Sequence, residues 1–268
     1  VCMGCEIRQD GFAAAAWEEC HAGGLRVWRS PVLAAVAGLA HGFTATSLNL
    51  SLSFGPGAER AAEDRRAVCS ALRLDPDRLV SGRQVHGVTV ACVECDGSAG
   101  PRVIADTDGL VTTARGVPLL ALSADCPLIV AVDAAAGALG VAHSGWRGSV
   151  AGMPVKLIEA LVAHCGAHAS RVVAAVSPCA GPDAYEIRDD VRTLVEQAMG
   201  DAEPYLARSG GGMFLNLPRL IAVQLAGAGV LPERIHLPAQ CSITDERFHS
   251  VRRNGPNSGH AGLIAGWV

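Results

Sequence analysis

The chain of 268 residues is half apolar but only 4% aromatic, so it can bury one large core that aliphatic side chains must fill. Its formal net charge of −4 indicates no basic face, which argues against binding to nucleic acid or to anionic lipid. The longest apolar stretches are interrupted by charge before they reach the ~20 residues that span a bilayer, and no secretory signal is visible at the start.

The chain contains ten cysteines. A chain with a full-sized core does not need disulfides for stability, so we expect reduced thiols and a cytoplasmic setting. Two Cys-x-x-Cys pairs, Cys2/Cys5 and Cys92/Cys95, could together form a structural zinc site, although neither has the flanking turn residues of a zinc knuckle. The sequence leaves the oligomeric state open between a monomer and a homodimer.

The first half of the chain predicts strands that alternate with helices, which is the α/β or α+β pattern. Residues 1–30 are expected to form a lead-in with one strand near 25–28, and residues 31–268 a single domain. Charged and apolar residues at helical spacing predict a helix over 58–74, which Asp75-Pro76-Asp77 ends. Alternating apolar residues predict strands over the ranges 80–93, 119–123, 128–133 and 138–142.

The second half continues in the same way. We expect a helix over 150–164, with Ser149 as its N-terminal cap, and another helix over 189–199 with acidic residues in its first turn. A third helix should open at Asn216 and run to the glycines at 227 and 229. Strands are expected over the ranges 172–176, 235–237, 248–252 and 261–268.

His86, Cys126 and His143 each stand at the end of an apolar run, inside a short polar segment that contains or adjoins a glycine or proline. Two imidazoles and one thiolate suit zinc and leave a fourth tetrahedral position for water or substrate. Such an open site is catalytic rather than structural. The spacing alone does not settle this, because a lone histidine at a strand end is often only hydrogen-bonded, and a cysteine after an apolar run is often a small buried hydrophobe.

A second mechanism fits the same residues. Cys126 could serve as a nucleophile, with His86 or His143 as its base and Asp125 as the residue that orients the base, as in a cysteine hydrolase. Arg147 follows His143 in a turn with glycines on both sides, where its guanidinium could bind an anion. The metal content of the protein would separate the two mechanisms.

With these motifs in place, the chain resembles the YfiH-like family, also described as the laccase-domain or multicopper polyphenol oxidoreductase family. The resemblance runs from about Gly38 to the C-terminus. It rests on the following segments: SLNL (47–50), RQVHG (83–87), DGLVT (108–112), ADCPLIV (124–130), AHSGWRG (142–148), PCAGPDAYEI (178–187), NLPRL (216–220) and FHSVRRNG (248–255).

The resemblance implies an α/β fold with layered, mixed β-sheets flanked by helices and a pocket at the strand ends. It implies that His86, Cys126 and His143 bind Zn²⁺, and that the substrates are purine nucleosides and phosphate. The implied activities are phosphorolysis of adenosine, inosine, guanosine and methylthioadenosine, together with adenosine deamination. We expect Asp125, Cys126 and Arg147 to be catalytic. Substrate is expected to contact a set drawn from the shared motifs, namely Asn49, Gln84, Ser144 and Arg147.

One segment departs from the family pattern. Family members usually carry a Ser-Thr-Arg segment and a glycine-containing loop before SLNL, and that arginine is thought to face the purine pocket. Here residues 41–46 run directly into Ser47, so the arginine and the loop are missing.

The alternative function is copper-dependent oxidation of polyphenols at the same three ligands. Blue multicopper oxidases need many histidine ligands, several of them in His-x-His pairs. This chain has nine histidines and no His-x-His pair, so it cannot build that centre. A single copper ion in place of zinc would still allow weak phenol oxidation.

Overall fold

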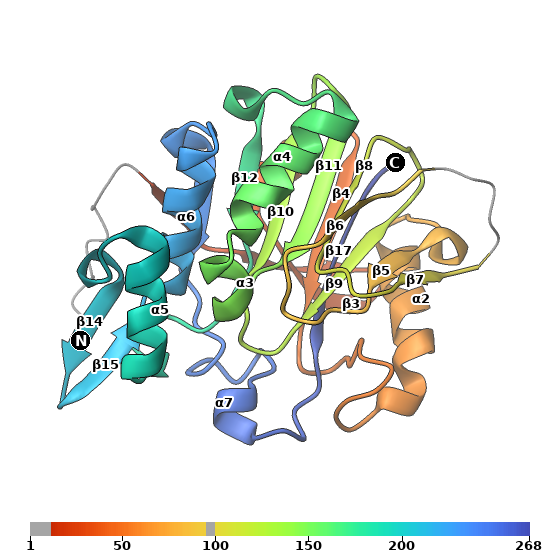
Figure 1. The fold of residues 1–268 in the computed structure, drawn as a ribbon. Coiled ribbons are helices and arrows are strands. Elements are labelled where there is room, and N and C mark those ends of the chain that lie inside the picture. The colour runs from red at the N-terminus through yellow and green to blue at the C-terminus, as the bar shows by residue number, and fades with distance from the viewer. Residues whose placement is uncertain (1–11, 95–99) are drawn as a thin grey trace.

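Two seven-stranded mixed β-sheets form the centre of the protein in the computed structural model, which describes residues 12–94 and 100–268 (Figure 1). The first sheet has the order β1 (Ala13–Ala15), β16 (Ile235–Pro238), β12 (Val173–Val176), β10 (Leu128–Asp133), β11 (Ala138–His143), β8 (Gly109–Thr112) and β6 (Val90–Cys92). The second has the order β2 (Glu18–Ala22), β3 (Leu25–Arg29), β4 (Leu39–Thr44), β17 (Ala261–Trp267), β9 (Leu119–Ser123), β5 (Val80–Gly82) and β7 (Arg102–Ile104). A smaller sheet consists of β13 (Glu186–Ile187), β15 (Gly212–Leu215) and β14 (Leu206–Ser209).

Helices cover the outer faces of the two large sheets (Figure 1). The α-helices of the described chain are α1 (Pro31–Ala34), α2 (Ala61–Ala71), α3 (Trp146–Val150), α4 (Met153–Cys165), α5 (Asp189–Met199), α6 (Leu217–Gly227) and α7 (Val251–Asn254). Among the described residues, no helix has both the length and the apolar character that crossing a membrane requires.

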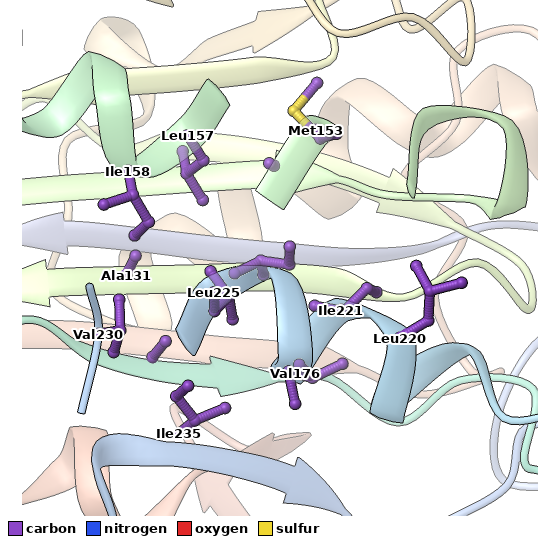
Figure 2. Close-up of a cluster of buried hydrophobic side chains, with 14 of the residues drawn as sticks. Ala131, Met153, Leu157, Ile158, Val176, Leu220, Ile221, Leu225, Val230 and Ile235 are labelled. Carbon is purple, nitrogen blue, oxygen red and sulfur yellow. The ribbon is translucent and has the colours of Figure 1, made fainter. Parts of the chain in front are cut away.

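Strand β10 shows how the sequence creates the layers. Its residues are all buried, and alternate side chains point to opposite faces of the sheet. Ile129 and Ala131 pack toward α4 and α6, where Figure 2 shows Leu157 and Ile158 of α4 and Leu225 of α6 around Ala131. The side chains of Leu128, Val130 and Val132 instead enter the core between the two sheets. Replacing a fully buried leucine of this kind with alanine typically costs about 2–5 kcal/mol of stability.

The second sheet repeats this arrangement. On β17, Leu263 and Ala265 contribute to the core between the sheets, whereas Ile264 packs on the other face against Val68 and Leu72 of the α2 region. The order of layers is therefore helix, sheet, sheet, helix. This is the layered α/β fold that the sequence predicted.

Most of the predicted elements are present. Strands β9, β10 and β12, helices α5 and α6, and the final strand β17 lie where the patterns placed them, within a few residues. The Asn216 side chain caps α6 as expected, because its Oδ1 accepts a hydrogen bond from the backbone N–H of Arg219 at 3.1 Å.

The continuous strand predicted over 80–93 was wrong. The structure has β5 and β6 with a loop between them, and His86 in that loop has a φ of 60°, which an extended strand does not allow. β5 and β6 belong to different sheets, so the interruption carries the chain from one sheet to the other. Apolar and polar residues also alternate through this loop, so the sequence pattern did not reveal the interruption between β5 and β6.

Three further expectations about local structure needed correction. Residues 248–252 form no strand; the Ser250 hydroxyl instead accepts from the Arg253 N–H and caps α7. Ser149 lies inside α3 rather than capping the following helix, and Gly152 is the cap of α4. The described part of the first 30 residues, from residue 12 onward, contains three strands where one was expected, and Trp17 and Trp28 are buried.

Candidate metal centre

The His/His/Cys cluster consists of His86, Cys126 and His143, whose ligand atoms all lie within 4.8 Å of one another. His143 is the last residue of β11, and it pairs with Leu128, the first residue of β10. Cys126 lies two residues before β10, so the antiparallel register brings its thiol to the end of β11. The structure thus brings together the three residues that the sequence predicted as metal ligands.

Asp108 organises the cluster from the neighbouring strand end. It directly precedes β8, which pairs with β11, and its carbonyl oxygen accepts from the His143 N–H at 2.8 Å. Its carboxylate Oδ1 lies 2.9 Å from Nδ1 of the His143 ring. Because an ionised carboxylate only accepts hydrogen bonds, Nδ1 is the donor, which leaves Nε2 of His143 for a metal ion.

The same carboxylate fixes the loop that carries His86. Its oxygens accept hydrogen bonds from the backbone N–H groups of Val85, His86 and Gly87, at 2.9 to 3.0 Å. These bonds satisfy donors that the β-ladder does not use and hold His86 in its left-handed conformation. The ring of His86 then meets that of His143 edge to face, with centroids 4.8 Å apart.

The cluster is electrostatically coupled. Burial opposes ionisation of the Cys126 thiol, but interactions with His143 and His86 outweigh it and lower the pKa of the thiol to about 6. Burial also disfavours a charged His143, yet the Asp108 and Cys126 partners prevail and raise the pKa of the imidazole to about 9. For Asp108, hydrogen bonds from His143 and the backbone outweigh burial and lower its pKa. A thiolate is therefore available at neutral pH, as metal binding requires.

Gly145 permits the close approach of the three ligands. A Cβ atom at this position would lie 2.8 Å from Sγ of Cys126 and 3.3 Å from Cδ2 of His86. Both distances are shorter than ordinary van der Waals contacts. Gly145 is therefore required beside the cluster because any larger side chain would collide with Cys126 and His86.

A cavity of about 630 Å³ opens at the cluster. The predicted residues Gln84, Asp125 and Arg147 line it together with the three ligands. Gln84 is held by two hydrogen bonds of 2.8 Å with the backbone of Leu122, and the Arg147 guanidinium is exposed and stacks over the Trp146 ring at 4.3 Å. A cavity of this size accommodates a drug-sized ligand.

Asp125 has a strained backbone and a fully engaged carboxylate. Its φ is 87°, its Oδ1 accepts from the Ser242 hydroxyl at 2.7 Å, and its Oδ2 accepts from the Arg252 N–H at 2.8 Å. These bonds join the Cys126 turn to two segments more than a hundred residues later in the chain. Asp125 thereby fixes the cavity wall around the cluster.

Two predicted substrate-binding residues lie outside the lining of this cavity. The Asn49 side chain donates to the carbonyl oxygens of Phe54 and Pro56 and accepts from the N–H groups of Ser51 and His260, so it organises a loop beside the cavity. Ser144 is fully buried, and its hydroxyl lies 2.8 Å from that of Ser149. Of the two predicted Cys-x-x-Cys pairs, Cys2, Cys5 and Cys95 lie outside the described residues.

Sequence reasoning missed the role of Asp108 and several residues of the cavity wall. The unpredicted lining residues include Arg65, Tyr185, Arg252 and His260. Asp108 had one usable signal, because an acidic residue directly before a buried strand is a natural partner for a histidine ligand at a neighbouring strand end. No local sequence signal indicated that His260 lines the cavity, because its position depends on the pairing of β17 with β4 and β9.

Comparison with known proteins identifies the family. A sequence model described as multi-copper polyphenol oxidoreductase laccase matches residues 36–267. The chain therefore belongs to this family, which confirms the resemblance that its motifs indicated.

Relatives within the family carry more specific names. The chain is 33% identical over 221 residues to the purine nucleoside phosphorylase ORF3 of Streptomyces griseus, which covers 82% of this chain and 86% of that protein. It is 31% identical over 222 residues to the adenosine deaminase RL5 of an unknown prokaryotic organism, with coverages of 80% and 84%. The crystal structure of YlmD from Geobacillus stearothermophilus superposes with a TM-score of 0.80 at 25% identity, covering 94% of this chain and 99% of that one.

The donor set fits one metal ion and no larger centre. Two imidazole nitrogens and a thiolate, with a carboxylate behind one imidazole, match the ligand chemistry of zinc. Within the described residues, this is the one group of three or more metal-ligating side chains. It supplies too few ligands for the several copper ions of a blue oxidase.

Proposed function

We propose that this protein is a zinc-dependent purine nucleoside phosphorylase that also deaminates adenosine. The His/His/Cys cluster, open to a cavity of about 630 Å³, is the observation that carries the proposal. The names of the relatives support this choice of reaction, because phosphorylases and an adenosine deaminase align over four-fifths or more of the chain. Adenosine, inosine, guanosine and methylthioadenosine are the substrates that we expect, with inorganic phosphate as the co-substrate.

We propose His86, Cys126 and His143 as the ligands of the metal. Zinc bound there would supply Lewis acidity toward the substrate, or would lower the pKa of a bound water to about 7 for deamination. Asp108 would hold His143 in the tautomer that binds metal and would keep the His86 loop in place. The pKa of Cys126, lowered to about 6, supports a thiolate ligand at neutral pH.

Phosphorolysis joins a phosphate oxygen to C1′ of the ribose and breaks the bond from C1′ to the purine nitrogen, with a proton delivered to the leaving purine. Arg147 is exposed at the cavity, and we propose that it contacts the phosphate. Gln84, which lines the same cavity, is proposed to contact the nucleoside. The two hydrogen bonds that occupy the Asp125 carboxylate support a positioning role for this residue rather than proton transfer.

The cellular setting is also a proposal. Described cysteines such as Cys69, Cys165 and Cys179 are buried and free. Free thiols at these positions support the reducing cytoplasm as the compartment.

Two assays test the function. Protein purified without added metal should contain about one zinc ion per chain. It should release purine from adenosine or inosine only when phosphate is present, with ribose 1-phosphate as the other product. Release without phosphate would indicate a hydrolase. Full turnover by metal-free protein would indicate the cysteine-nucleophile mechanism.

A second candidate function follows from the description of the family. Copper at the same ligands would make the protein a weak polyphenol oxidase, because copper binds nitrogen and sulfur ligands more tightly than zinc. Phenol oxidation by the copper-loaded protein, combined with no turnover of any nucleoside, would establish this function instead. The assay should use zinc-loaded and copper-loaded samples of one preparation.

A further inference from the structure

Arg65 lines the cavity of the His/His/Cys cluster from helix α2. Only 8% of the residue is exposed, and its Nε donates to the carbonyl oxygen of Leu50 at 2.8 Å. Within the described part of the chain, this is the one hydrogen bond that the guanidinium makes. Its two terminal NH2 groups therefore remain available as donors at the cavity wall.

No carboxylate of the described residues pairs with Arg65. The preceding residue, Asp64, accepts from the backbone N–H of Asn49, and the following residue, Arg66, pairs with Asp77 at 2.8 Å. Burial lowers the pKa of the Arg65 guanidinium, but a guanidinium stays protonated at any pH at which a protein is folded. A buried cation without a counter-ion lowers stability, because a single hydrogen bond to a carbonyl offsets only part of the loss of its hydration. An anionic ligand would supply the missing charge.

The charges around the cavity point to the same kind of ligand. The residues that line it include four arginines, namely Arg65, Arg83, Arg147 and Arg252. Asp125, whose oxygens already accept two hydrogen bonds, is the one carboxylate among the described lining residues. A cavity that is cationic and walled by protein concentrates anions.

Arg65 differs from the other three arginines. Arg83 is exposed and pairs with Asp106, Arg252 is exposed and lies over the Tyr185 ring, and Arg147 is exposed and lies over the Trp146 ring. Arg65 alone of the four is buried, and the Leu50 carbonyl holds it in place. A buried and held guanidinium loses little freedom on binding, so it is the strongest anion donor of this set.

We infer that Arg65 anchors an oxyanion subsite in this cavity and that the anion is a phosphate group. The planar guanidinium can present two N–H groups to two phosphate oxygens. The phosphate could be the free co-substrate or a phosphate carried by a nucleotide. Its assignment to the co-substrate rests on the proposed function, whereas the anion site itself does not.

Direct binding measurements test the subsite without turnover. Calorimetry with the zinc-loaded protein in chloride buffer would measure the dissociation constants of inorganic phosphate, adenosine and adenosine 5′-monophosphate. The variants are Arg65→Met, which removes the charge at similar length, and Arg65→Lys, which keeps a cation. Arg66→Met is the matched control, because it removes the same charge from the next residue of the same helix, outside the cavity.

Arg65→Met should weaken binding of a phosphate group by at least about tenfold, Arg65→Lys by less, and Arg66→Met not measurably. If the phosphate is the co-substrate, the loss appears with inorganic phosphate. If it belongs to a nucleotide, wild-type protein binds the monophosphate more tightly than adenosine, and the Arg65 variants lose that difference.

Wild-type affinity for both phosphates in Arg65→Lys, or in a folded Arg65→Met, would overturn the subsite. So would a wild-type protein that binds neither phosphate. Phosphate binding that depends on Arg65, in a protein that cleaves no nucleoside, would keep the subsite and refute the proposed function. Phosphorolysis with an unchanged KM for phosphate in an Arg65 variant would keep the proposed function and refute the assignment of this anion to the co-substrate.

Discussion

The Asp108 carboxylate accepts a hydrogen bond from the His143 ring, with Oδ1 and Nδ1 2.9 Å apart in the buried end of the first sheet. The same side chain accepts the backbone N–H of His86 at 3.0 Å. One carboxylate thus sets the ring orientation of one proposed ligand and the loop conformation of another. Loss of this carboxylate should affect the metal before it affects any substrate contact.

Asp108→Asn should weaken zinc binding by about 10- to 100-fold, because the amide is a poorer acceptor for the His143 ring and for three backbone N–H groups. Competition with a chromophoric chelator would measure the affinity. Asp106→Asn is the control, since Asp106 is exposed and pairs only with Arg83 among the described residues. Equal zinc affinity in wild type and Asp108→Asn would refute the organising role.

Cys126→Ser should lose zinc and turnover together, because a serine hydroxyl is not deprotonated at neutral pH and binds zinc poorly. Metal analysis by mass spectrometry and the phosphorolysis assay would measure the two losses. Cys20→Ser removes a free thiol of β2, outside the cluster and the cavity lining, and should change neither. If Cys126→Ser kept its zinc but lost turnover, the thiolate would be a nucleophile rather than a ligand.

The sequence predicted the His/His/Cys cluster because the information was local. His86, Cys126 and His143 each stand in a short polar segment that follows an apolar run. The α/β class followed from patterns such as that of β10, where every residue is apolar or at the strand end, and the layered arrangement was implied by the family resemblance. Neither inference needed long-range information.

What the sequence did not reveal depends on contacts between distant segments. Asp125 meets Ser242 and Arg252, and Arg65 lines the same cavity as Arg147 although helix α2 lies across the second sheet from the cluster's own strands. The strand predicted over 80–93 was wrong for the same reason, because the Asp108 carboxylate that holds the loop lies some twenty residues away. Pairing of strands must be known before such contacts can be inferred.

His41 should make the protein less stable in acid. The residue is fully buried, its Nε2 accepts from the Ser30 N–H, and burial lowers the pKa of the ring to about 3. Below the ordinary pKa of 6.5 the unfolded chain binds a proton that folded His41 refuses. The free energy of unfolding therefore falls as pH decreases from about 6.5 toward 3, by up to about 1.4 kcal/mol per pH unit.

His41→Gln removes this titration while keeping an acceptor for Ser30. Denaturant unfolding between about pH 7 and pH 5 should show a shallower loss of stability in the variant than in wild type. His21→Gln, at an exposed position of β2, should follow wild type and serves as the control. Parallel pH profiles for wild type and His41→Gln would show that His41 does not stay neutral in the folded protein.

Arg147→Ala should alter the reaction and leave the fold intact. The side chain is exposed and stacks on Trp146, so its removal opens no core cavity and touches no metal ligand. Loss of a charge-assisted contact to a transition-state oxyanion typically lowers turnover on the order of 10²-fold. The variant should therefore keep its zinc and its melting temperature while kcat falls and the KM for phosphate rises.

Arg208→Ala, which removes an exposed arginine paired with Glu203 on the small sheet, is the control for the Arg147 variant. Because Arg65 is buried and held whereas Arg147 is exposed, loss of Arg147 should reduce kcat more than ground-state phosphate binding, and loss of Arg65 should do the reverse. An Arg147→Ala protein that unfolds, or one that turns over normally at low phosphate, would leave Arg147 with no role in the reaction.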